Sequence, residues 1–197
     1  MRRWLPLLAA CLLAASCTGS TTYVDFLPEI YPDYIGVTIP ADIAPMNFNL
    51  PEEYDRVLVR VTGSKGGELK VTGRWADFPV KAWHRITEQN AGGTLTFTVL
   101  GRKDDQWTQW RDFIMYVSDV PLTDYGITYR KIAPGYTTYS RIGIYQRNIH
   151  SFREDPIIES TLTPGQCVGC HTPNATDPDQ FLFHLRGPHG EIGRAHV

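Results

Sequence analysis

The chain has 197 residues, of which 42% are hydrophobic and 20% are charged, and its formal net charge is -2. This composition is ordinary for a globular protein, so it excludes intrinsically disordered, collagen-like and coiled-coil chains. Lys and Arg (19) do not outnumber Asp and Glu (21), so charge offers no argument for a nucleic-acid partner. The length suits one domain, or one domain with a substantial extension.

Residues 1–17 predict an export signal that ends at a lipidated cysteine. Arginines precede an apolar run over residues 4–15, which is the order found in a signal peptide. The run is shorter than the roughly 20 residues of a membrane-spanning helix. The small residues before Cys17 resemble the lipobox of bacterial lipoproteins, while Cys11 is the alternative, with a better lipobox but a shorter apolar core. We therefore expect a lipid anchor to the membrane, on the periplasmic side of the cell envelope; a plain cleaved signal is the other interpretation.

The middle of the chain, residues 31–120, has the pattern of a β-sandwich-like domain. Gly-rich turns and runs of alternating apolar and polar residues predict several short strands, and no stretch keeps a helical period for more than two turns. The expected strands are 55–61, 68–72, 94–100 and 113–117. This pattern favours a mainly-β fold in which two sheets pack face to face.

Trp107, Trp110 and Tyr116 lie close together in this region and admit two interpretations. They could form an aromatic platform for a ligand, or they could pack within and along the sheet. Since a binding site needs convergent polar groups and aromatic residues favour half-buried sheet surfaces, packing is the preferred interpretation.

The remaining segments are expected to carry little regular structure. A tether (18–30) precedes the β domain, and an aromatic-rich connector (121–155) and a polar, loop-rich segment (156–190) follow it. The last residues, 191–197 (EIGRAHV), resemble the translation of a common sequencing adapter. We interpret them as an artefact, with the natural protein continuing past Gly190.

Residues 167–171 read CVGCH, which is the C-x-x-C-H signature of c-type haem attachment. The thiols of Cys167 and Cys170 are spaced to form thioethers with the two vinyl groups of one porphyrin, and His171 is then the expected axial ligand of the iron. Covalent attachment suits an exported protein, because it prevents loss of the cofactor. The axial ligands and their surroundings would set the reduction potential. The sixth iron ligand is expected to be His184 or His189, or the iron is five-coordinate.

Three other interpretations of the motif remain. Cys167 and Cys170 can form a small structural disulfide, since exported proteins are oxidised. They can be a redox-active pair, although no thioredoxin-like βαβ pattern surrounds them. Together with His171 and either His184 or His189 they can bind zinc, although adjacent Cys and His ligands are awkward for that geometry.

Several stretches resemble a specific group of exported proteins. They are YPDY through IAPMNF (31–48), IGIYQRNIHSF, PIIESTLTPGQCVGCHTPN and FLFHLRGPHG. Over most of residues 25–190 the chain is similar to the TolB-like lipoproteins of Bacteroidetes, often labelled as cytochrome c biosynthesis or WD40-like propeller proteins. The resemblance implies a β-rich region and a CxxCH segment, matched here by Cys167, Cys170 and His171. It also implies a β-propeller of PD40 repeats that is missing from this chain by truncation.

Two functions follow as hypotheses. The first is a membrane-anchored periplasmic lipoprotein with one covalent c-type haem, acting in electron transfer or as a haem-dependent accessory with a redox or envelope protein partner. The second is a cell-envelope interaction scaffold in which the CxxC is a structural disulfide or metal site. An enzyme is the weakest hypothesis, because the sequence contains neither a Ser-His-Asp order nor an H-E-x-x-H pattern.

Overall fold

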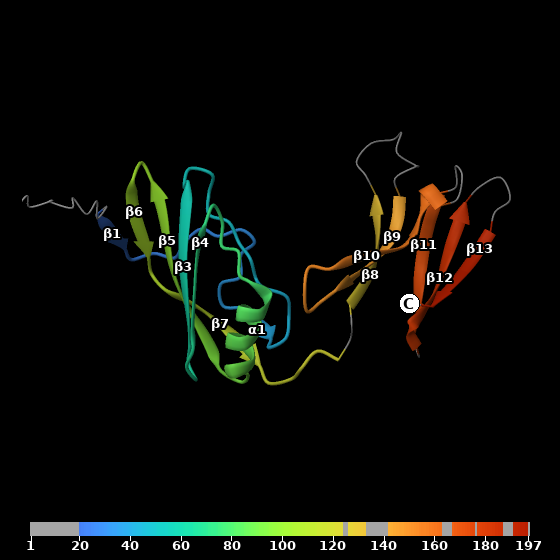
Figure 1. Ribbon diagram of the computed structural model, residues 1–197, viewed down its shortest axis with the longest axis horizontal. Helices are drawn as coiled ribbons and strands as arrows, with labels where there is room; N and C mark the ends of the chain where they lie inside the picture. Colours follow the sequence, from blue (N-terminus) through green and yellow to red (C-terminus); the bar gives the residue numbers. More distant parts are fainter. Residues whose placement is uncertain are drawn as a thin grey trace, which may run out of the picture.

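The computed structural model describes residues 20–123, 126–132, 142–162, 167–175, 177–186 and 191–196. Their strands form one seven-stranded and two three-stranded sheets, so the expected mainly-β fold is confirmed. Figure 1 shows two groups of elements, strands β1 to β7 with helix α1 in one and strands β8 to β13 in the other. Within this described part of the chain, no helix combines the length and apolar content needed to cross a bilayer.

The first group is a single sheet built around its longest strand. Its elements are β1 (Thr21–Val24), β2 (Thr38–Pro40), β3 (Arg56–Gly63), β4 (Glu68–Gly73), β5 (Thr94–Lys103), β6 (Gln106–Trp110) and β7 (Phe113–Ser118). The four strands expected from the sequence are β3, β4, β5 and β7. Strand β5 pairs with β3 along one side. Along its other side, its first half pairs with β7 and its second half with β6. Strands β1 and β2 extend the β6 and β7 edge in parallel.

One face of this sheet forms the main core. Alternation places nine residues on that face, and all are buried: Val57, Val59, Val61, Leu95, Phe97, Val99, Phe113, Met115 and Val117. The rings of Phe97 and Phe113 stack at 4.8 Å with an interplanar angle of 4°. The aromatic and β-branched residues that predicted these strands are therefore the residues that fill the core.

Helix α1 (Val80–Gln89) covers this face, which corrects the expectation that no helix lies in this region. It buries Trp83, Ile86 and Thr87, at the i, i+3, i+4 spacing of one helix face. Together with the loops that carry Phe48 and Phe78 it takes the place of the expected second sheet, so this part is not a sandwich. The helix was missed because Thr87 is polar, which leaves its buried face with few apolar residues.

The second group consists of two antiparallel three-stranded sheets (Figure 1). One contains β8 (Gly126–Ile132), β9 (Ile142–Asn148) and β10 (Glu154–Glu159), which is followed by the short helix η2 (Ser160–Leu162); the other contains β11 (Cys167–Asn174), β12 (Asp177–Arg186) and β13 (Glu191–His196). The expected connector (121–155) and loop-rich segment (156–190) therefore contain strands. Their prolines and polar composition hid these strands from sequence patterning, because half-buried and exposed residues outnumber the buried ones in β8, β9, β10 and β11.

The two small sheets pack against each other through Ile144 on one side and Val168, Phe181, Phe183 and Leu185 on the other. Face-to-face packing of sheets therefore occurs, but in the C-terminal half of the chain. Strand β13, in the stretch attributed to adapter, pairs with β12 through its backbone. This pairing uses backbone N–H and C=O groups, which every residue except proline has in full. It therefore does not distinguish an adapter-derived stretch from a natural one.

A few polar contacts connect the two groups of elements. The backbone N–H of Ala44 donates to the carbonyl of Ile149 at 2.8 Å. The imidazole Nδ1 of His150 lies 2.9 Å from the carbonyl oxygen of Asp42 and 3.3 Å from its carboxylate. That carboxylate also accepts a hydrogen bond from the backbone N–H of Leu122 at 3.2 Å. The loop before β3 is thus tied to the turn between β9 and β10.

Candidate functional site

The CxxCH motif occupies the first five residues of β11, and the pairing with β12 is irregular there. Cys167 lies opposite Arg186 and Val168 opposite Leu185, but His171 lies opposite Phe183. Two residues of β11, Gly169 and Cys170, therefore share one position of β12, which is His184. This arrangement is a β-bulge.

The bulge brings both thiols to the same face of the sheet. In a regular strand, residues three apart point to opposite faces, which would separate Cys167 from Cys170. Here Val168 and His171 both lie on the face that packs against the first small sheet, so the bulge turns Cys170 outward with Cys167. Cys167 is half-buried and Cys170 is exposed, and they form no disulfide.

His171 lies on the other face, between the two small sheets. Its Nε2 is 3.3 Å from the carbonyl oxygen of Thr128 in β8, to which it donates when that nitrogen carries the proton. Its ring meets Phe181 edge-on, with centroids 6.3 Å apart and an interplanar angle of 80°. The histidine of the motif thus joins β11 to β8.

His184 occupies the outer face. It alternates along β12 with Phe183 and Leu185, which are buried in the core between the small sheets, so its side chain belongs to the opposite face. It is half-buried and lies directly across from the bulge. The other predicted ligand, His189, and both candidate lipidation sites, Cys17 and Cys11, lie outside the described residues.

The donors present match a covalent haem in type but not in arrangement. Two free thiols share an accessible face, as thioether formation requires, whereas the imidazole of His171 points to the opposite face. The motif as folded therefore does not fit a haem held by Cys167, Cys170 and His171 together. Among the described residues, no group of three His, Cys, Asp or Glu side chains converges closely enough to hold a metal ion.

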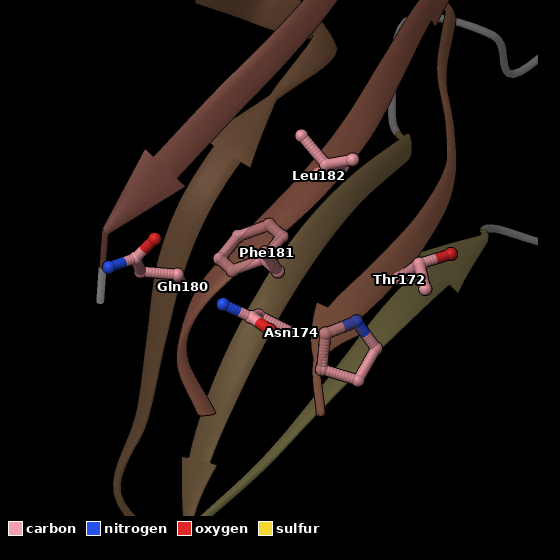
Figure 2. A pocket seen from close by; sticks show the side chains of 6 residues that line it. Thr172, Asn174, Gln180, Phe181 and Leu182 are labelled. Carbon is pink, nitrogen blue, oxygen red and sulfur yellow. The ribbon is translucent and has the colours of Figure 1, made fainter. Parts of the chain in front are cut away.

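A pocket of about 320 Å³ lies farther along the same hairpin (Figure 2). Its walls come from Thr172, Pro173 and Asn174 of β11 and from Gln180, Phe181 and Leu182 of β12. The volume is at the lower end of the range of about 300–1,000 Å³ that is usual for small-molecule sites. Thr172 and Leu182 are opposite each other in the register, one pair beyond His171 and Phe183, so the pocket begins two residues along β11 from Cys170.

No protein-family model matches this chain, and a search of curated proteins found no match.

The aromatic residues considered for a ligand platform do not form one. Trp110 is 4% exposed and belongs to the core of the large sheet. Trp107 and Tyr116 lie on its solvent-facing side, opposite Arg102 and Thr94 respectively. Their partners on β5 are eight positions apart, which is about 26 Å at roughly 3.3 Å per residue. The packing interpretation holds for Trp110, and the other two are too distant to share a ligand.

A polar network that the sequence pattern did not reveal lies on the outer face of the first small sheet. Lys131 and the hydroxyl of Tyr129 both bond to the carboxylate of Glu154, and their hydrogen bonds lower its pKa. The hydroxyl of Tyr145 donates to Glu159, and this bond, with a smaller contribution from burial, raises the pKa of Tyr145 to about 12. The i, i+2 spacing of Tyr129 and Lys131 is the local signal that places them on one strand face.

Proposed function

We propose that this chain is part of an exported, lipid-anchored envelope protein that carries one covalent c-type haem on Cys167 and Cys170. Its role is electron transfer, or that of a haem-dependent accessory to an envelope partner. The observation that supports the proposal is the bulge in β11, which brings two unbonded thiols to one accessible face. When bound, the haem supplies one-electron redox chemistry.

The local surroundings suit a covalently held group better than a freely exchanging one. The outer face of β11 and β12 is open, with Cys170 exposed and Leu182 52% exposed. A site this open encloses little of a ligand, and non-covalent ligands are usually held in clefts that bury most of their surface. Two thioethers would hold a large planar group on an open face without such a cleft.

The second candidate is an envelope interaction scaffold in which the CxxC is structural. It is favoured by the position of His171, whose imidazole already has a packing and hydrogen-bonding role between two sheets. In an oxidising compartment the two thiols on one face would then be joined as a disulfide.

The test is export of the full chain in a host with c-type haem maturation machinery, followed by intact mass and a reduced-minus-oxidised spectrum. The double variant Cys167→Ala/Cys170→Ala is compared with Thr172→Ala, an exposed residue of the same strand. We expect a haem mass adduct and a c-type α band in the wild type and in Thr172→Ala, and neither in the double variant. A colourless wild type lighter by two hydrogen atoms than its reduced form would instead support the scaffold, because disulfide formation removes two protons and two electrons.

A further inference from the structure

The thiols and the histidine of the CxxCH motif lie on opposite faces of β11. The thiols of Cys167 and Cys170 belong to the outer face, whereas His171 belongs to the inner face, against Phe181. Among the residues whose side chains the structure describes, the histidine on the outer face with the thiols is His184.

No register of this strand brings the two thiols and His171 to one face. With the bulge present, Cys170 turns outward and His171 inward. If the bulge were removed, strict alternation from Val168 would turn His171 outward and Cys170 inward. In either register Val168 stays in the core, where it is fully buried, so the strand cannot rotate as a whole without exposing it.

His184, unlike His171, lies on the same face of the sheet as the two thiols. Residues directly opposite each other on one face of an antiparallel pair have Cβ atoms roughly 4.5–5.5 Å apart, and His184 is the residue opposite Gly169 and Cys170. Gly169 allows the close approach of the strands here, because a Cβ at that position would lie 3.3 Å from the carbonyl oxygen of His184. His184 therefore lies across the hairpin from Cys170, on the same face of the sheet.

We infer that His184 is the imidazole on the cofactor side of this hairpin, and that His171 is a positioning residue that joins β11 to β8. This inference rests on the proposed function, since it names the imidazole that faces a haem attached to Cys167 and Cys170. It reverses the assignment expected from the motif, in which His171 is the axial ligand.

The test compares His184→Ala and His171→Ala in the haem-loaded full chain, with intact mass, the absorption spectrum and thermal unfolding of the haem-free protein as readouts. We expect His184→Ala to keep the covalent haem but to shift the Soret and α bands, and added imidazole to restore them. We expect His171→Ala to keep the wild-type spectrum and to lower the thermal stability of the haem-free protein. His184→Ala should leave that stability close to the wild-type value.

The possible failures are distinguishable. A wild-type protein without haem would overturn the proposed function itself. A covalent haem whose bands shift in His171→Ala, alone or together with His184→Ala, would overturn only the assignment, because it would place His171 on the iron. Bands that shift in neither variant would also overturn the assignment, while haem attachment to the cysteines would stand.

Discussion

The imidazole Nε2 of His171 lies 3.3 Å from the carbonyl oxygen of Thr128, so the histidine of the CxxCH motif links two separate sheets. This link depends on the ring being turned into the interface, where it also meets Phe181. A residue that the sequence marks for cofactor chemistry therefore has a structural contact in the folded chain.

The first prediction concerns that link. His171→Phe should keep the ring packing but lose the hydrogen bond, at a cost of about 1 kcal/mol; His171→Ala should lose both and cost more. The measurement is native-state hydrogen exchange of the β8 amides, which reports local opening. Replacement of Thr172, exposed on the same strand, by Ala is the control and should leave that exchange unchanged. Equal exchange in His171→Ala and the wild type would show that the contact contributes no stability.

The second prediction concerns the unequal exposure of the two thiols. Cys170 is exposed and Cys167 is half-buried, and access is one of the factors that sets thiol reactivity. In the haem-free, reduced protein, iodoacetamide should therefore alkylate Cys170 faster than Cys167. The single variants Cys167→Ser and Cys170→Ser separate the two rates, and the difference should become small in denaturant. A native Cys170 that reacts more slowly than Cys167 would contradict the bulge, because without it Cys170 would turn inward.

The third prediction concerns the core of the large sheet. Phe97→Ala should destabilise the first group of elements by about 3–5 kcal/mol, because Phe97 is fully buried and stacks on Phe113. Tryptophan fluorescence follows this unfolding selectively, since every tryptophan precedes residue 111. Phe26→Ala is the control, because that ring is 59% exposed. Similar losses in both variants would be inconsistent with this core.

The fourth prediction concerns the buried Asn90, which ends helix α1. Its side chain accepts a hydrogen bond from the N–H of Lys65 at 2.7 Å and donates to the carbonyls of Gly66 and Ile86 at 3.0 and 2.7 Å. Asn90→Ala leaves these groups without their partner and should cost about 1–3 kcal/mol. The exposed neighbour, as Gln89→Ala, is the matched control and should unfold near the wild-type denaturant midpoint. An unchanged midpoint for Asn90→Ala would refute this role.

The strands of the large sheet were predictable because their chemistry is local. The residues from Thr94 to Leu100 alternate strictly, and β5 contains all of them. Helix α1 was not predictable in the same way, because its buried face includes Thr87, whose hydroxyl finds partners within the helix and in the loop at Ala41. Contacts of the Thr87 hydroxyl thus stabilise a helix that the apolar pattern of the sequence does not predict.

The motif itself was also visible in the sequence, whereas its geometry was not. The bulge depends on which residue of β12 opposes which residue of β11, and nothing within CVGCH specifies that. The segment 156–190 was expected to be polar and loop-rich, yet Phe181, Phe183 and Leu185 alternate into a core. That core needs Ile144 of another sheet to complete it, which the local sequence does not show.

The fifth prediction concerns the alkaline limit of the first small sheet. The hydrogen bond to Glu159 raises the pKa of Tyr145 from 10.0 to about 12, so the neutral phenol is favoured in the folded state. The sign follows from linkage: this contribution to stability is complete below pH 10 and is lost as the pH rises from 10 to about 12.

Titration of tyrosinate absorbance measures this directly. Tyr145→Phe should remove one late-ionising phenol, and Glu159→Gln should shift the ionisation of Tyr145 to lower pH by removing the acceptor carboxylate. The exposed Tyr31, replaced by Phe, is the control and should leave the late step in place. If the late step keeps its full amplitude in Tyr145→Phe, Tyr145 does not contribute a late-ionising phenol and its bond to Glu159 does not keep it neutral. The first small sheet of Tyr145→Phe should then lose as much stability above pH 10 as the wild type does.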